Sequence, residues 1–228
     1  MKKTIIILAA LLFTIGANAQ NVKFGLKGGL NLSQISEMTI KESGEKDASF
    51  DVAPDMLMGF HVGGLVNISF GEFFGLQPEL FFSTQGGKSS NAFGLADFSE
   101  YIDGIEFKFK LNYINVPVLF EVKPITNFSL LVGPQIGLNM SRTISISGGG
   151  ESATISGSDF DDMFEGEAKF SKIDFAAVVG AQYAVMGKFL ISARYNLGFA
   201  PIFKSEVSDI KVTGGANRVI QVNIGWLF

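Results

Sequence analysis

The sequence predicts an all-β chain, folded as an eight-stranded antiparallel up-and-down transmembrane β-barrel. First, its 228 residues include 27 glycines and 23 phenylalanines, and glycine with aromatic residues is typical of β-rich chains. Second, eight segments alternate apolar and polar side chains with a period of two, which is the pattern of strands. Third, the connections between these segments alternate between long and short. The segments are residues 22–34, 56–69, 73–86, 106–122, 128–142, 171–186, 188–200 and 217–228.

The N-terminal residues have the pattern of a secretory signal peptide. Lys2 and Lys3 precede an apolar run from Ile5 to Ile15, and an A-x-A motif then ends at Ala19. A charged start, a short apolar core and small residues at the cleavage site define such a signal, and the apolar run is too short for a membrane anchor. We therefore expect an exported chain. The expected parts are a signal peptide at 1–19 and a barrel domain at 20–228.

The composition excludes several other classes of protein. The chain has no cysteine, so we expect neither disulfides nor a lipid-modified cysteine at the cleavage site. The formal net charge is −4, and a mildly acidic exported protein is not expected to bind nucleic acid. No uncharged apolar run of about 18 residues follows residue 19, so a membrane would have to be crossed by a closed barrel.

The connections place all long loops at one end of the predicted barrel. The segments are joined in strict alternation by long and tight connections, as in outer-membrane barrels with long extracellular loops and short periplasmic turns. Both termini then fall on the periplasmic side. The tight turns are "FGEF" at 70–73, "KPITN" at 123–127 and "MGK" at 186–188, and the long polar loops are 35–55, 87–105, 143–170 and 201–216.

The two faces of the strands differ in a way that indicates which one touches lipid. One face is bulky, apolar and uncharged, whereas the other is rich in glycine and mid-sized polar residues. An eight-stranded barrel has an interior only just wide enough for side chains, so we place the bulky face against lipid. A soluble lipocalin-like ligand-binding barrel, with the faces reversed, is the main structural alternative. The charged and imidazole side chains predicted to form a polar network in the lumen are Lys27, His61, Glu79, Lys108, Lys110, Asp174 and Arg194.

Aromatic residues cluster at the strand ends, as expected for girdles at the two water–lipid boundaries. The alternative is that phenylalanine is simply a good strand former, but clustering at the ends favours girdles. The turn-end band contains Phe24, Phe70, Phe73, Phe74, Phe120, Phe128, Phe189, Trp226 and Phe228, and the loop-end band contains Phe82, Phe107, Phe109, Phe175 and Phe199.

The fourth segment is less regular than the others. Its apolar set begins with Phe107 and Phe109 but shifts after Tyr113 to the even-numbered positions. Pro117 cannot donate a ladder hydrogen bond. We therefore expect a β-bulge near Tyr113–Pro117.

Several stretches resemble the PorT-like family of outer-membrane β-barrels. They are "KFGLKGGLNLSQIS", "LNYINVPVLFEVKP", "LLVGPQIGLNM" and the aromatic C-terminus, and Tyr113, Pro117 and the aliphatic residues beside that proline match the fourth strand of the family. The resemblance implies an outer-membrane barrel and a role associated with the type nine secretion system. It implies no catalytic residues. The strand that ends on Trp226 and Phe228 resembles the C-terminal signal that the barrel assembly machinery reads.

Three features raise the question of chemistry. His61, the only histidine, has no partner identifiable from spacing, so we favour a structural lumen residue over the catalytic base of a lipid enzyme. The lumen charges have both signs, so we favour a salt-bridged plug over an ion path. The acidic stretch 158–167 (Asp159, Asp161, Asp162, Glu165 and Glu167) could offer oxygen ligands to calcium but lacks the EF-hand pattern, and we favour a solvated loop.

The function expected from the sequence is therefore that of a non-enzymatic integral outer-membrane barrel, without cofactor or metal. Expected partners are outer-membrane lipid, the barrel assembly machinery during biogenesis and secretion-system proteins. The alternatives are a small pore for ions or solutes and a soluble lipocalin-like binder.

Overall fold

The computed structural model describes residues 21–36, 38–42, 48–50, 53–89, 106–148, 151–156, 168–207 and 210–228. The predicted signal peptide and the acidic stretch 158–167 lie outside the described residues, so both stay predictions. None of the described residues forms a helix of the length and apolarity needed to cross a membrane.

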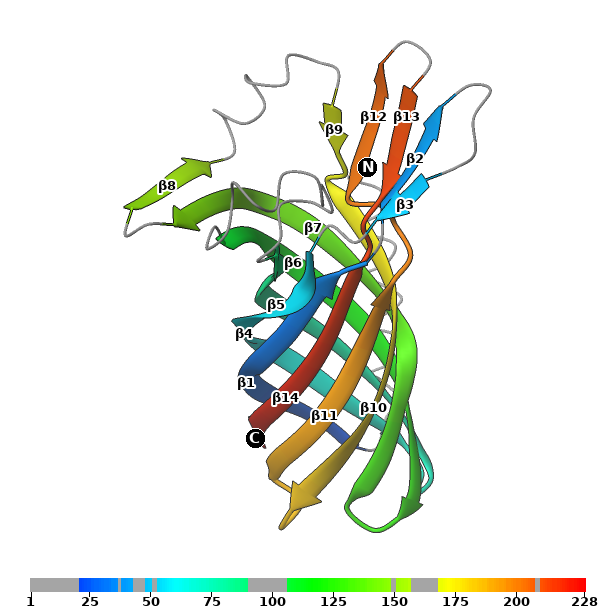
Figure 1. Cartoon of the computed structure of the whole chain (residues 1–228). Helices are drawn as coiled ribbons and strands as arrows, with labels where there is room; N and C mark the ends of the chain where they lie inside the picture. Colours follow the sequence, from blue (N-terminus) through cyan, green and yellow to red (C-terminus); the bar gives the residue numbers. More distant parts are fainter. Residues whose placement is uncertain are drawn as a thin grey trace, which may run out of the picture.

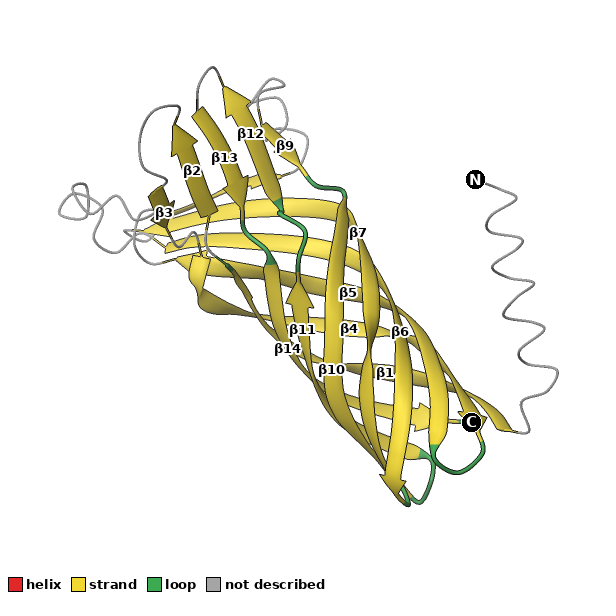
Figure 2. Cartoon of the chain, turned by 90° about the vertical axis from the view of Figure 1, so that its right-hand side faces the viewer, coloured by secondary structure: helices red, strands yellow, loops and turns green. Residues whose placement is uncertain are grey.

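Eight antiparallel strands close into a barrel, which confirms the predicted fold (Figures 1 and 2). Their order is β10-β11-β14-β1-β4-β5-β6-β7, and the pairing of β7 with β10 completes the ring. The first strand pairs with the last, from Gly25 opposite Leu227 to Ile35 opposite Asn217. The barrel strands are β1 (Asn21–Ile35), β4 (Ala53–Phe70), β5 (Phe74–Ser89), β6 (Glu106–Ile125), β7 (Phe128–Gly148), β10 (Ile173–Val185), β11 (Phe189–Gly198) and β14 (Asn217–Leu227).

The tight turns lie where they were predicted, but much of the long connections is not loop. A second, five-stranded sheet stands beyond the loop end of the barrel, in the order β3-β2-β13-β12-β9, and β8 continues β7 as a hairpin (Figures 1 and 2). The interpretation of 35–55 and 201–216 as loops is therefore wrong, because short strands pair with one another there. The stretch "SISGGGESATISGS" at 145–158 is typical of a flexible segment or a loop hairpin, and the pairing of β7 with β8 confirms the hairpin. These strands are β2 (Met38–Glu42), β3 (Ala48–Phe50), β8 (Glu151–Ser156), β9 (Ala168–Phe170), β12 (Phe203–Val207) and β13 (Ile210–Gly214).

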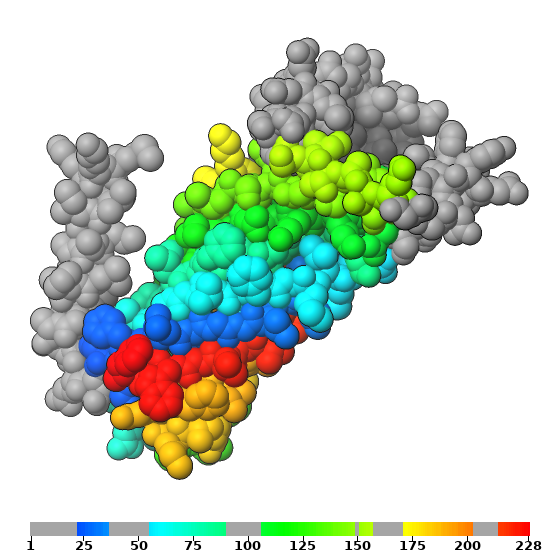
Figure 3. Space-filling view, turned by 90° about the vertical axis from the view of Figure 1, so that its left-hand side faces the viewer, coloured from blue at the N-terminus to red at the C-terminus, as the bar shows by residue number. Residues whose placement is uncertain are grey.

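The apolar face of the strands points outward, as predicted. On β14 the even-numbered side chains are exposed, with 54% of Val222 and 71% of Phe228 accessible, while the odd-numbered Gln221 and Asn223 are buried. The same alternation runs along β1. Neighbouring strands present their outer side chains as one continuous wall (Figure 3). This arrangement is the reverse of a soluble lipocalin-like barrel, whose apolar residues face inward.

The outward aromatic residues occupy the ends of the barrel wall. In the turn-end band, Phe74 stacks on Phe120 with 5.8 Å between ring centroids, and Phe189 lies opposite Trp226 on β14. At the loop end, Phe82, Phe175 and Phe199 are exposed.

A register shift between Asn112 and Tyr113 confirms the expected irregularity of the fourth segment in its position, but the extra residue lies on the neighbouring strand. Asn112 pairs with Ser141 but Tyr113 pairs with Asn139, so the extra residue of the register shift belongs to β7 and not to β6. Throughout β6 from Leu111 to Glu121 the odd-numbered residues are buried. The apolar set changes sides because the lumen itself becomes apolar at the loop end, where Ile35, Leu111, Tyr113 and Ile202 form a buried cluster. Phe109 packs against this cluster and is not part of an outer girdle.

Candidate functional site

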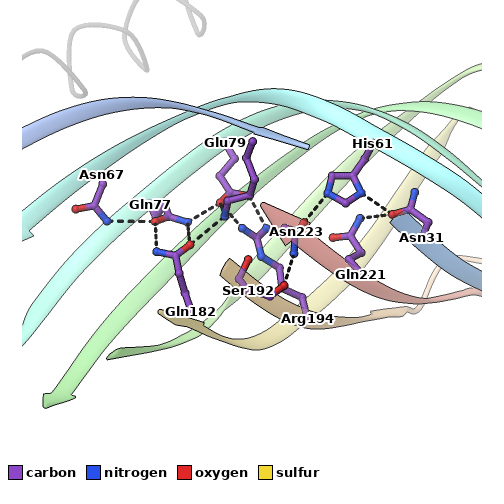
Figure 4. Close-up of polar contacts among 11 residues, drawn as sticks. Asn31, His61, Asn67, Gln77, Glu79, Gln182, Ser192, Arg194, Gln221 and Asn223 are labelled. Carbon is purple, nitrogen blue, oxygen red and sulfur yellow. Dashed lines mark hydrogen bonds and ion pairs between the residues drawn. The ribbon is translucent and has the colours of Figure 1, made fainter. Parts of the chain in front are cut away.

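The candidate site is the polar interior of the barrel, and an ion triad lies at its centre (Figure 4). Glu79 on β5 accepts two hydrogen bonds from Arg194 on β11, Nη1 to Oε2 and Nη2 to Oε1, both 2.5 Å long. Lys27 Nζ on β1 donates to Glu79 Oε1 over 3.1 Å. The three side chains are at most 1% exposed. Removing such charges from water is costly, and pairing with direct hydrogen bonds offsets that cost.

Amide side chains extend the triad toward the turn end. Gln77 Nε2 donates to Glu79 Oε1 over 2.6 Å, and Gln182 Oε1 accepts from Lys27 Nζ over 3.1 Å. Farther along, Asn67 Nδ2 donates both to Gln77 and to Glu121 Oε2. These contacts join residues on β1, β4, β5, β6 and β10, so the interior holds opposite walls of the barrel together.

His61 belongs to a separate amide cluster on the loop side of the triad. Its Nδ1 lies 2.7 Å from Asn31 Oδ1 and its Nε2 lies 2.5 Å from Asn223 Oδ1. Both ring nitrogens face an amide oxygen, which can only accept, and a neutral imidazole donates through one nitrogen, so the tautomer decides which of the two contacts is a hydrogen bond. Within the described residues, neither ring nitrogen contacts a hydroxyl or carboxylate that could complete a catalytic pair.

Asp174 lies at the loop end of the lumen, away from the triad. Its Oδ2 accepts a 2.8 Å hydrogen bond from Asn217 Nδ2, and that nitrogen also lies 3.2 Å from the hydroxyl of Tyr113. The buried apolar cluster of Ile35, Leu111, Tyr113 and Ile202 lies at the same end.

Lys108 and Lys110, predicted to point inward, do not belong to the lumen. Both lie on the even-numbered, outer side of β6, Lys110 is exposed, and the Lys108 side chain is 44% exposed. Lys108 Nζ pairs with Glu106 Oε1 at 2.6 Å. The prediction is wrong because the inner face of β6 stays on the odd-numbered residues. Only the position of the apolar residues changes at Tyr113, from the inner face to the outer one.

Other lumen residues were missed by the sequence argument. Tyr113, Glu121 and Asn217 are all buried and take part in the interior contacts described above. For Glu121, the period of two offered a signal: it lies two residues after Leu119, so both side chains are on the same, inner face of β6. The lumen is also less polar than predicted, because it contains two further buried apolar clusters. One consists of Leu65, Leu190 and Leu227, and the other of Leu119, Leu131 and Val178.

A closed barrel with an apolar outer wall, aromatic residues at its ends and a hydrogen-bonded polar interior defines the class of integral outer-membrane β-barrels. The family model described as "Outer membrane protein beta-barrel domain" matches residues 18–204. This chain therefore belongs to the outer-membrane protein β-barrel domain family, which implies integral residence in an outer membrane.

Solved structures of low sequence identity have a related shape. A major outer membrane protein from Thermus thermophilus is 11% identical, with 92% of this chain and 100% of that chain covered and a TM-score of 0.50. OprG from Pseudomonas aeruginosa is 16% identical over 90% and 95%, with a TM-score of 0.46. Ail, the attachment invasion locus protein of Yersinia pestis, is 17% identical over 92% and 100%, with a TM-score of 0.42. No curated protein sequence matches this chain.

Proposed function

We propose that this barrel is a non-enzymatic membrane scaffold that binds a partner through the strands beyond its loop end. The observation that carries the proposal is the blocked lumen: Glu79, Lys27 and Arg194 meet at its centre with almost no exposed surface. In a barrel of eight strands the interior is already narrow. A function at the ends of the barrel is therefore better supported than transport through it.

The loop-end sheet is the surface we assign to the partner. Its five strands pair with one another rather than with the barrel, and its edge strands β3 and β9 each have one side that pairs with no other described strand. Edge strands offer backbone donors and acceptors to another chain. In the proposed orientation this sheet is extracellular and both termini are periplasmic, in keeping with the tight turns at their end of the barrel.

The finer assignment to the PorT-like group, and a role in type nine secretion, rest on the resemblance around Tyr113 and Pro117. The test is to delete the gene and quantify the proteins that the type nine system secretes. Complementation with the wild-type chain should restore any loss. Unchanged secretion in the deletion strain would remove the secretion role and leave the stand-alone scaffold.

Fractionation and partner capture test the scaffold itself. The protein should be in the outer-membrane fraction, should change its gel mobility on boiling, and should co-purify with a partner from the same membranes. A variant lacking 38–50, which removes β2 and β3, should keep the mobility change and lose the partner. A partner retained by that variant would contradict the assignment of the binding surface.

A small pore is the second candidate function, and one observation favours it. Ser192 Oγ, Arg194 Nε and both amide atoms of Asn196 lack hydrogen-bond partners among the described residues. These three residues succeed one another along the inner face of β11, and water satisfies buried polar atoms of this kind. Conductance of the purified barrel in a planar bilayer decides between the two: the scaffold should be silent, whereas a hydrated path along β11 should carry current.

The lipid-enzyme hypothesis has its own test. His61→Ala in the purified barrel should leave the rate of phospholipid hydrolysis at the background level of the wild type. Hydrolysis by the wild type that this substitution abolishes would establish an enzyme.

A further inference from the structure

The barrel wall is taller on one side, and its outer face changes from apolar to polar there. Strands β6 and β7 are 20 and 21 residues long, whereas β11 and β14 have 10 and 11. From the turn end up to Phe82 on β5, Ile114 on β6 and Met140 on β7, every outward side chain is apolar. Beyond these three residues, each outward position of the same strands is a polar residue or glycine. The β7–β8 hairpin continues this side of the wall (Figure 1).

A chain of side-chain hydrogen bonds marks where the apolar wall ends. Thr84 Oγ1 donates to Asn112 Oδ1 over 3.0 Å, and Asn112 Nδ2 donates to Ser141 Oγ over 2.9 Å. The three residues pair directly across β5, β6 and β7, at the first outward positions beyond the apolar ones. They therefore form a polar belt across three strands. Since polar groups are costly in hydrocarbon, we place the boundary between lipid chains and lipid headgroups at this belt.

Beyond the belt, hydroxyl groups occupy the outward positions of the β7–β8 hairpin. Those of Ser145 and Thr154 lie 3.2 Å apart. A hydroxyl group both donates and accepts hydrogen bonds, so this hydroxyl row can bind the oxygen atoms of a glycerol, sugar or phosphate group. The directly paired residues are Thr143 with Ser156, Ser145 with Thr154 and Ser147 with Ser152.

Two lysines on the same outer face have carboxylates beside them. Lys88 on β5 and Lys108 on β6 pair in register, and both contact Glu106, with Nζ–Oε distances of 3.4 and 2.6 Å. Asp55 on β4 lies opposite Lys88. The positive charge of this pair of lysines is therefore largely balanced within the protein.

Lys110, one outward position nearer the belt, has no carboxylate beside it. It is exposed. The backbone at Gly86, its partner on β5, has a φ of 142°, and a Cβ there would lie 1.8 Å from the backbone oxygen of Phe109. Glycine is required at that position, so no side chain covers Lys110 from the β5 side. The outward positions around Lys110 are Gly86 and Thr143 on the neighbouring strands and Lys108 and Asn112 on its own strand.

We propose that this polar outer face, from the belt to the hydroxyl row, binds phosphorylated lipid headgroups. The face continues the apolar wall without a break, so a lipid whose chains lie on Phe82 and Ile114 brings its headgroup to Asn112 and Lys110. An ammonium group binds phosphate as a point charge, and basic residues at a membrane boundary attract anionic headgroups. Lys110 supplies the unbalanced charge, and the hydroxyl row binds the rest of the headgroup. This site does not depend on a partner of the loop-end sheet.

The test measures the lipid composition directly beside this face. Phe82→Trp, combined with Trp226→Phe to remove the only natural tryptophan, gives one indole just below the belt. The full barrel is refolded into phosphatidylcholine vesicles with phosphatidic acid as a minor component, and the chains of one lipid or the other carry bromine. The two quenching levels give the local ratio of the lipids. Phosphatidic acid should be enriched about threefold or more over its share of the vesicle.

The lysines should account for this enrichment. Lys108→Gln with Lys110→Gln, both on the outer face, should bring the local ratio down to that of the vesicle. The matched control is Lys23→Gln with Lys188→Gln, which removes two exposed cations at the turn end and should leave the enrichment unchanged. Heat-modifiable gel mobility verifies that each variant has folded.

Two outcomes would overturn the proposal. One is equal quenching by the two lipids, in proportion to their shares, when both lysines are present. The other is an enrichment that survives Lys108→Gln with Lys110→Gln or does not fall when NaCl is added, because salt screens exposed charges. If Phe82→Trp does not refold, Met140→Trp is the reporter, since Met140 is 63% exposed on β7 beside the same belt.

Discussion

Glu79 and Arg194 form a bidentate ion pair across the full width of the barrel. Their strands, β5 and β11, are separated by β14, β1 and β4 on one side and by β10, β7 and β6 on the other, so the two residues come from opposite walls. The pair therefore ties together parts of the sheet that share no backbone hydrogen bonds. Lys27, from β1 between them, binds the same carboxylate.

Neutralising the shared carboxylate should destabilise the barrel strongly. Glu79→Gln leaves the buried Lys27 and Arg194 without their counter-charge, and breaking a buried ion pair in this way costs about 3–5 kcal/mol. Urea unfolding of the barrel in phospholipid vesicles measures the loss. The matched control is Glu72→Gln, whose exposed turn position predicts no change. Equal free energies of unfolding for the two variants would contradict the role of the triad.

The two cations should not contribute equally to the triad. Arg194 makes two charge-assisted hydrogen bonds to Glu79, whereas Lys27 makes one and shares its ammonium with Gln182. Double-mutant cycles of Glu79→Gln with Arg194→Met and with Lys27→Met should give a coupling energy about twice as large for arginine. A larger coupling for lysine would show that this geometry does not set the energetics.

A charge on the outer wall should be costly only at membrane depth. Val222 lies outward in the middle of β14, and Val222→Arg should destabilise the barrel by about 2–4 kcal/mol in lipid. Met186, 94% exposed in the β10–β11 turn, provides the control, and Met186→Arg should be nearly neutral. Unfolding in lipid vesicles measures both. A neutral Val222→Arg would argue for a water-facing wall and hence for the soluble alternative.

The C-terminal aromatic residues should matter for assembly more than for the finished barrel. Phe228 is 71% exposed, and its backbone nitrogen donates to Phe24 O. Phe228→Ala preserves that hydrogen bond and removes only the ring. We expect a lower yield of heat-modifiable barrel in cells, with nearly unchanged stability after refolding in detergent. Phe199→Ala, an outward aromatic at the loop end, is the control and should assemble normally.

The period-two pattern predicted most of the barrel because each side chain on a strand has only two directions available. Lys27, Glu79 and Arg194 share the face of the small and polar residues, and the structure places them inside together. The pattern could not reveal their partners, since the Glu79–Arg194 contact depends on which strands lie opposite after closure. Lys108 and Lys110 were misplaced because charge was used as the mark of the lumen in a region where the lumen is apolar. The strands beyond the barrel were missed because β12 and β13 are only five residues long each, too short for their alternation to stand out within a connection interpreted as a polar loop.

Closure between β1 and β14 also sets a constraint in time. Among the described strands, β1 is synthesised first and β14 last. The second edge of β1 stays unpaired until β14 is made, so the seam from Gly25–Leu227 to Ile35–Asn217 cannot form on a growing chain. Until then both seam edges, and the apolar wall around them, remain open to aggregation. We therefore expect a holding chaperone to protect the chain between export and insertion. Depleting that chaperone should leave the chain degraded or aggregated, and not half-built in the membrane.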